Sequence, residues 1–207
     1  MKILCLGAHP DDIELMAGGT ILKLVSEGHQ VFGVVFTDGS WSLPDGRIAR
    51  DPELAKQENI NAANYLNYDL LWLNETALNL TYCDRLVVEV LNIIEAKEID
   101  TLILPYFDDL HKDHRIVNEL GIAASRRIPR VLHGQINYFM GSFFTPNFFV
   151  DISLTYSKKI EALSMFTSVW AKNAQNWEEF LHATHTYYGK IIGTEKAEGF
   201  ITKKYLL

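Results

Sequence analysis

Short, continuous apolar runs alternate along the first part of the chain with longer segments whose apolar residues recur every three to four positions. The short runs predict buried strands, and the longer segments predict amphipathic helices. The expected strands are Lys2–Gly7, Gln30–Thr37, 70–73 and 101–104, and the expected helices are 15–27, 52–66, 82–97 and the segment after His114. This alternation is typical of a parallel sheet covered on both faces, so we expect an α/β fold: a Rossmann-like, doubly wound, mostly parallel sheet.

The pattern changes after residue 130. Apolar and polar residues alternate over 130–140, which predicts a half-exposed strand, antiparallel at an edge of the sheet. Residues 147–152 predict another strand, and residues 153–169 and 177–192 predict two closing helices. No internal repeat, low-complexity segment or linker interrupts the pattern, so we expect residues 1–207 to form one domain.

Composition narrows the class of protein. The formal net charge of −7 argues against nucleic-acid binding but is compatible with a polar or sugar substrate. Two cysteines, Cys5 and Cys83, are too few for a disulfide framework and indicate reducing surroundings. The first apolar run stops at His9, too early for a signal peptide, and no stretch is long enough to cross a membrane. We therefore expect a soluble cytoplasmic protein.

Chemically active side chains follow two of the expected strands. Ala8-His9-Pro10-Asp11-Asp12-Ile13-Glu14 comes directly after the first strand and lies on a strand-to-helix turn that Pro10 stiffens. The adjacent aspartates repel each other unless a positive group lies beside them, and a divalent cation is the simplest such group. His111-Lys112-Asp113-His114 follows the strand 101–104. If these two strands are neighbours, His9, Asp12 and His114 meet at the carboxyl edge of the sheet, and their donor atoms suit Zn²⁺ with one position open for water.

Each of these residues also has a simpler explanation. Asp11 or Asp12 could cap the helix, and Glu14 could complement the helix dipole. His182 and His185 share a helix face, but no acid or cysteine accompanies them, so a second metal site is disfavoured. A nucleotide site of the Rossmann type has no support, because Gly-x-Gly-x-x-Gly follows none of the expected strands.

The two motifs together resemble the PIG-L/LmbE family of metal-dependent N-deacetylases. That family includes N-acetylglucosaminyl-phosphatidylinositol deacetylase and the deacetylases of bacillithiol and mycothiol synthesis. The resemblance extends to Thr37-Asp38-Gly39, to the run from Pro146 to Ile152 and to Ala197-Glu198-Gly199-Phe200, and so covers most of the chain.

The resemblance implies a role for each matching residue. His9, Asp12 and His114 are implied to be the metal ligands, and Asp11 the general base that takes a proton from the attacking water. His111 is implied to polarise the carbonyl or protonate the leaving amine, with Asp113 orienting His111.

The resemblance further implies hydrolysis of an N-acetyl group on an N-acetylglucosamine-like sugar or conjugate, with Zn²⁺ or another divalent metal as cofactor. Two alternatives stay open: hydrolysis of another amide-type bond on a non-sugar metabolite, and metal or sugar binding without turnover. The loop 41–51 departs from the family pattern at Gly39-Ser40-Trp41-Ser42, so we expect it to form a wall of the pocket that influences substrate choice. Several phenylalanines between residues 139 and 149 predict either core packing or the interface of a homo-oligomer.

Overall fold

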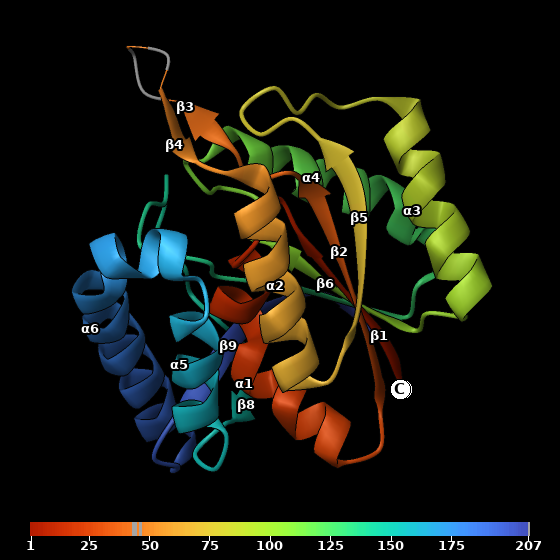
Figure 1. Ribbon diagram of the computed structural model, residues 1–207. Helices are drawn as coiled ribbons and strands as arrows, with labels where there is room; N and C mark the ends of the chain where they lie inside the picture. The colour runs from red at the N-terminus through yellow and green to blue at the C-terminus, as the bar shows by residue number, and fades with distance from the viewer. Residues whose placement is uncertain (43–44, 46, 207) are drawn as a thin grey trace.

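Seven strands form one sheet in the computed structural model, which describes residues 1–42, 45 and 47–206 (Figure 1). In spatial order the strands are β5 (Asp69–Glu75), β2 (Gln30–Thr37), β1 (Lys2–Gly7), β6 (Thr101–Pro105), β7 (Arg130–Gly134), β9 (Ala197–Tyr205) and β8 (Phe148–Asp151). The first five are parallel to one another, and β9 runs antiparallel to both β7 and β8. The predicted α/β fold with a mostly parallel sheet is confirmed.

Helices cover both faces of this sheet. On one face lie α1 (Asp12–Ser26), α2 (Pro52–Leu66), α5 (Tyr156–Ser164) and α6 (Thr167–Ile192), and on the other lie α3 (Asp84–Lys97) and α4 (Lys112–Ala124), which the short helix η1 (Ser125–Arg127) follows. Strand β1 separates the two cores, because Ile3 and Cys5 pack on the first face and Leu4 and Leu6 on the second. All four side chains are buried, which explains why the run is apolar at every position.

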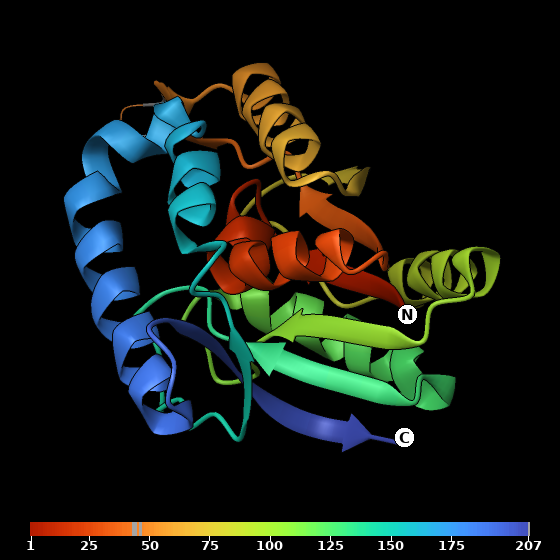
Figure 2. The ribbon, with the colours of Figure 1, turned by 90° about the horizontal axis from the view of Figure 1, so that it is seen from below.

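The prediction for residues 130–140 is wrong in two respects. Only Arg130–Gly134 is a strand, and β7 is parallel to β6 rather than an antiparallel edge. The reason is β9, a strand that the sequence pattern did not predict, which pairs with the other side of β7 (Figure 2). The polar residue that suggested exposure, His133, is buried, and its Nδ1 lies 2.7 Å from Asn118 Nδ2.

The predicted closing helices also need correction. Helix α5 ends at Ser164, and α6 already begins at Thr167 rather than at residue 177. The first turn of α6 is capped from another helix, since the Glu58 carboxylate of α2 accepts hydrogen bonds from the Thr167 hydroxyl and the Ser168 N–H. Local sequence cannot report a cap that comes from a distant segment.

The predicted loop 41–51 contains a small antiparallel pair, β3 (Trp41–Ser42) and β4 (Ile48–Arg50). Leu43, Pro44 and Gly46, which belong to the predicted loop, lie outside the described residues. Trp41, at the start of β3, is paired with Arg50, at the end of β4.

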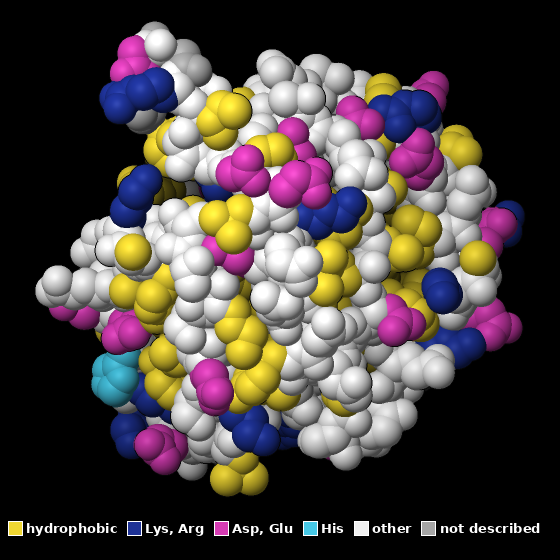
Figure 3. Space-filling model, viewed as in Figure 1, with side chains coloured by type: hydrophobic (Ala, Val, Ile, Leu, Met, Phe, Trp, Pro, Cys, Tyr) yellow, Lys and Arg dark blue, Asp and Glu magenta, His cyan; other side chains and the backbone are white. Residues whose placement is uncertain are grey.

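Among the helices of the described residues, none combines the length and the apolar character that a membrane crossing requires. On the face shown in Figure 3, apolar side chains are interspersed with charged side chains of both signs.

Candidate metal centre

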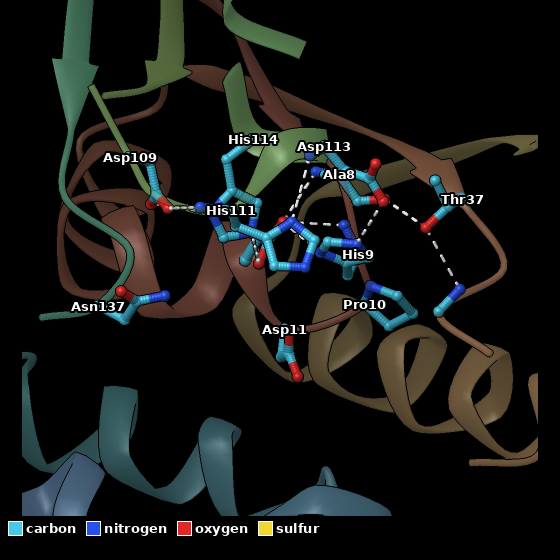
Figure 4. Close-up of polar contacts among 12 residues, drawn as sticks. Ala8, His9, Pro10, Asp11, Thr37, Asp109, His111, Asp113, His114 and Asn137 are labelled. Carbon is cyan, nitrogen blue, oxygen red and sulfur yellow. Dashed lines mark hydrogen bonds and ion pairs between the residues drawn. The ribbon is translucent and has the colours of Figure 1, made fainter. Parts of the chain in front are cut away.

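Strands β1 and β6 are neighbours, as the sequence analysis required. From this pair the chain winds outward in both directions, through β2 to β5 and through β7, so their carboxyl ends flank the switch in strand order. His9 and Asp12 follow β1, and His114 lies in the first turn of α4 after β6. Figure 4 shows the rings of His9, His111 and His114 gathered at this edge.

The Asp12 carboxylate lies between two imidazoles. Its Oδ1 is 3.3 Å from His114 Nε2, and its Oδ2 is 3.4 Å from His9 Nδ1. Ligand atoms 2.0–2.1 Å from a tetrahedral Zn²⁺ lie about 3.3–3.4 Å apart, and each of these two separations, made by a different oxygen of Asp12, is of that size. Backbone N–H groups of Ala8 and His9, each 2.8 Å from Oδ2, hold the carboxylate in place.

The other nitrogen of each imidazole meets a second carboxylate. His9 Nε2 lies 3.1 Å from Asp113 Oδ2, and His114 Nδ1 lies 2.8 Å from Asp109 Oδ2. Such pairs fix ring orientation and tautomer, leaving the opposite nitrogen free to bind a metal. Asp109 is 1 % exposed, and the sequence analysis missed it because it precedes the motif His111–His114. Its position two residues before His111, in the loop after β6, was the available signal.

His111 is the third imidazole of the cluster. One ring nitrogen from each of His9, His111 and His114 lies within 4.8 Å of the others, so these three histidines also form a geometrically acceptable ligand set. The backbone N–H of Asp113 donates to His111 Nδ1 over 3.2 Å, which places the proton of the neutral ring on Nε2. Burial and the neighbouring His9 and His114 lower the pKa of His111, which favours this neutral form.

The carboxylate of Asp113 contacts a different residue from the one expected. The sequence analysis assigns it to His111, but its carboxylate faces His9 and accepts the Leu78 N–H over 2.8 Å. Only the backbone of Asp113 reaches His111. Leu78 has a φ of 64°, a left-handed conformation that non-glycine residues rarely adopt, and this conformation presents its N–H to the cluster.

Asp11 stands apart from the histidines and lines a cavity of about 360 Å³ in front of them. Its φ of 105° is unusual for a residue with a side chain. In Figure 4 its carboxylate points away from the three histidine rings. The nearest cation is Arg50, whose Nη1 lies 3.5 Å from Asp11 Oδ2. Burial raises the pKa of Asp11 to about 7, with Arg50 opposing and Asp12 adding to the rise.

Arg50 is a further site residue and lies in the predicted loop 41–51. It is 5 % exposed and lines the cavity, where its guanidinium also approaches the Pro10 carbonyl. Its Nε donates to the Ser168 hydroxyl over 3.1 Å, and Glu58 lies 3.8 Å from its Nη2. The side chain is therefore fixed by α2 and α6, two elements remote from it in sequence.

The remaining cavity wall comes from the segments that follow β2 and β5. Thr37 ends β2, and its N–H and hydroxyl both donate to the Ala8 carbonyl, which ties β2 to the His9 turn. Gly39 has a φ of 64° and packs against Pro10, where a Cβ would come within 2.5 Å of the proline ring. Trp41 and Leu78 complete the wall, and Lys172 of α6 lies over the Trp41 ring at 5.5 Å.

The acidic centre attracts protons when no metal is present. Burial disfavours the imidazolium of His114, but Asp12 and Asp109 outweigh burial and raise the pKa of His114 to about 10. Burial likewise opposes protonation of His9, whereas Asp12 and Asp113 raise its pKa to about 9. Asp12 is itself held below its usual pKa: burial acts the other way, and His114 and His9 overcome it. Metal and protons therefore compete for the same two nitrogens.

Residues that the sequence analysis set aside prove to be structural. Glu14 is fully buried and accepts from the Tyr68 hydroxyl over 2.6 Å, so it does not act as an exposed partner of the helix dipole. His185 is buried, and His182 lies 3.0 Å from Lys196 Nζ. Neither histidine belongs to the metal-ligand cluster found in the described residues.

A buried ion pair contacts the middle of α1, the helix that begins at Asp12. Lys159 Nζ lies 2.6 Å from Glu198 Oε1, and both side chains are at most 1 % exposed. Lys159 donates to the Leu15 carbonyl over 2.7 Å, while Glu198 accepts from the Gly19 and Thr20 N–H groups. Glu198 thus binds the backbone of α1 and is not among the residues that line the cavity of Asp11.

A mostly parallel α/β sheet with histidines and carboxylates at its switch point defines the class: an enzyme with a metal centre at the carboxyl edge of its strands. The chain belongs to the PIG-L family, whose model, described as GlcNAc-PI de-N-acetylase, matches residues 4–125. The predicted family and the predicted N-deacetylase activity are confirmed, and metal dependence is consistent with that family.

Relatives of known name are similar over nearly the whole chain. The diacetylchitobiose deacetylase of Thermococcus kodakarensis is 30% identical over 96% of this chain and 81% of its own. The structure of N,N'-diacetylchitobiose deacetylase from Pyrococcus horikoshii shares the fold with a TM-score of 0.81, 24% identity and coverage of 97% of this chain and 83% of that one. GalB, the 4-carboxy-2-hydroxymuconate hydratase of Pseudomonas putida, shares it with a TM-score of 0.84 at 16% identity, covering 100% and 97%.

Proposed function

We propose that this protein is a zinc-dependent hydrolase that removes the N-acetyl group from an N-acetylglucosamine-like sugar or conjugate. The observation that carries the proposal is the placement of the Asp12 carboxylate between His9 and His114 at 3.4 and 3.3 Å. Asp11 lies on the cavity side of this group, free of the histidines.

His9, Asp12 and His114 would hold the metal. Two nitrogens and one oxygen suit Zn²⁺ and leave a position open, whereas Mg²⁺ and Ca²⁺ prefer all-oxygen sets. When bound, Zn²⁺ lowers the pKa of water towards 7 and polarises a carbonyl group. Asp109 and Asp113 act on the ligands by orienting His114 and His9.

The other side chains would perform the proton transfers. Asp11 accepts a proton from the attacking water, and a carboxylate whose pKa is raised to about 7 is a suitable base near neutral pH. His111 donates a hydrogen bond from Nε2 to the carbonyl oxygen as negative charge develops there. Asp113 maintains that tautomer through its backbone N–H at Nδ1. Asp11 can then return its proton to the departing amine.

The sugar substrate is inferred from the relatives and from the cavity. Two similar proteins are named as diacetylchitobiose deacetylases. The cavity of about 360 Å³ is lined by the indole of Trp41, an apolar surface suited to the face of a pyranose ring, and by the Arg50 guanidinium. We propose that the segment 41–51 is the wall that selects the substrate. The fold alone does not select the reaction, since GalB shares it and is named a hydratase.

The test is acetate release from N-acetylglucosamine conjugates by protein stripped with a chelator and reloaded with Zn²⁺. We expect turnover only in the reloaded protein and little in Asp11→Asn, with Asp69→Asn, an exposed carboxylate in β5, as the matched control. Acetate release from non-sugar amides alone would establish the alternative hydrolase. Tight sugar binding without any release would establish a binding protein.

We retain three further proposals from the sequence: a single domain over residues 1–207, a cytoplasmic location and assembly into a homo-oligomer. Light scattering on the purified protein tests the last of these.

A further inference from the structure

A second and larger cavity, of about 840 Å³, lies between residues 135–146 and the last turns of α6. We call it the aromatic groove. Five aromatic side chains line it: Tyr138, Phe143, Phe144, Tyr187 and Tyr188. Phe143 is 98% exposed and Tyr187 66%, so these two rings are not part of the core, whereas Tyr188 is buried. Among its lining residues in the described part of the chain, none carries a charge.

The aromatic groove adjoins the metal centre through a shared loop. Asp109, which orients His114, forms a β-bridge with Met140, and the Leu110 N–H donates to the Phe139 carbonyl over 3.1 Å. The Tyr106 hydroxyl meets the Ser142 hydroxyl at 2.9 Å. The segment that leads into His111 is therefore paired with the segment that lines the groove.

Apolar surface and a polar side chain connect the two regions. Leu110, next to His111, and Phe139 are both more than half exposed. The side chain of Asn137, one residue from Tyr138, accepts a hydrogen bond from the Phe139 N–H over 2.6 Å. A ligand that extends from the metal centre along the paired segments 106–110 and 139–142 would therefore reach the aromatic groove.

The lining indicates the chemistry of the ligand. A pyranose ring has apolar faces that stack on aromatic rings and hydroxyl groups that hydrogen-bond at its rim. The groove offers tyrosine rings together with Gln135, Ser142 and Thr184, and its volume lies in the range of small-ligand sites. A phosphate or carboxylate would find no countercharge there. A second protein copy would need about 800 Å² of complementary surface on each partner, whereas this feature is concave and joined to the catalytic loop.

We propose that the aromatic groove binds the uncharged sugar rings that follow the N-acetylated sugar of the substrate. The substrate class is then a neutral N-acetylated oligosaccharide rather than a conjugate with a phosphate or carboxylate. This inference rests on the proposed deacetylase function and deepens it.

The experiment compares kcat/KM for N-acetylglucosamine, its β-1,4-linked trisaccharide and UDP-N-acetylglucosamine with the zinc-loaded protein. We expect the trisaccharide to exceed the monosaccharide by about tenfold, the size of one good aromatic contact. In Tyr187→Ala this ratio falls towards one. The matched control Tyr205→Ala, an exposed tyrosine at the end of β9 outside the groove, keeps the wild-type ratio.

The possible failures are distinguishable. Absence of turnover with every sugar overturns the proposed function, whereas equal turnover of monosaccharide and trisaccharide overturns only the groove. Preference for the UDP conjugate also overturns the groove. If light scattering finds a dimer that Tyr187→Ala dissociates while the trisaccharide ratio is unchanged, the groove is an interface between copies and the proposal is wrong.

Discussion

Asp109 Oδ2 lies 2.8 Å from His114 Nδ1, and both side chains are at least 96 % shielded from solvent. The same carboxylate accepts the His111 N–H through its other oxygen, at 2.7 Å. One aspartate thus aligns a predicted metal ligand and a predicted catalytic histidine.

Asp109→Asn should lower zinc affinity by about 10- to 100-fold, as loss of such a partner usually does, because the amide stabilises the ring less well. Isothermal titration with Zn²⁺ measures the change. The control is Asp108→Asn, whose half-buried side chain belongs to the same loop but faces Gly141. Equal zinc affinity in Asp109→Asn and wild type would contradict this role.

Asp11→Asn should keep zinc while its turnover falls by about 10² to 10⁴, the usual effect of losing a general base. Asparagine tolerates the positive φ of 105° at this position, so the backbone is expected to stay unchanged. Asp12→Asn should instead lose zinc, because a neutral amide is a weak ligand beside two imidazoles. Metal content and turnover are measured on both variants side by side. Near-normal turnover in zinc-loaded Asp11→Asn would place the base elsewhere.

His111→Ala separates the two ligand sets that the geometry allows. If Asp12 completes the set, the variant retains zinc and loses turnover by about 10² or more, since it lacks the donor to the developing oxyanion. His114→Ala, matched in size and position, should lose zinc. The opposite result, zinc lost from His111→Ala and kept by His114→Ala, would favour the set of three histidines.

The metal-free protein should become less stable as pH rises above neutrality. The pKa values of His9 and His114, about 9 and 10, exceed the ordinary value of 6.5. Their contribution is therefore fully present below pH 6.5 and is lost as pH rises through 9 and 10. Each tenfold difference in proton affinity corresponds to about 1.4 kcal/mol.

Denaturant midpoints of chelator-treated protein at pH 6, 8 and 10 test this, with His114→Ala as the variant in which the slope should flatten. Zinc should reverse the trend, because deprotonated imidazoles bind it better at higher pH. If the denaturant midpoint of the metal-free protein rose between pH 6.5 and 9, His9 and His114 would not be protonated in the folded state as proposed.

The sequence predicted those parts of the fold in which local pattern and tertiary environment agree. Buried runs such as Gln30–Thr37 are apolar on both faces because helices cover both faces. It missed β9, since Lys203 and Lys204 interrupt the apolar pattern in a strand whose outer half is more exposed. The start of α6 depends on Glu58, which is more than 100 residues away.

In the candidate site, too, the residues that follow strands were predicted, and the contacts that depend on distant segments were not. His9, Asp12 and His114 are adjacent to strand ends, so topology alone brings them together once β1 and β6 pair. Arg50 was missed because its burial depends on Ser168 and Glu58, contacts that no local pattern reports. The carboxylate of Asp113 faces His9 because Leu78 supplies its second hydrogen bond.

The pair Lys159–Glu198 should stabilise the fold strongly once formed. Glu198→Gln leaves the buried ammonium without a countercharge and should cost about 3–5 kcal/mol of unfolding free energy. The double variant Lys159→Met, Glu198→Gln should recover part of this loss, because no unpaired charge remains. Chemical denaturation measures all three proteins, with the exposed neighbour Lys158→Met as control. A double variant no more stable than Glu198→Gln would contradict the pairing.

Glu198 accepts hydrogen bonds from Gly19 and Thr20 across separations of 179 and 178 residues. During synthesis, the helix that begins at Asp12 leaves the ribosome long before the strand that pins it. Contacts of such sequence separation are slow to form and close late in folding. The nascent chain therefore carries the turn from His9 to Asp12 for most of translation without the two hydrogen bonds by which Glu198 holds α1.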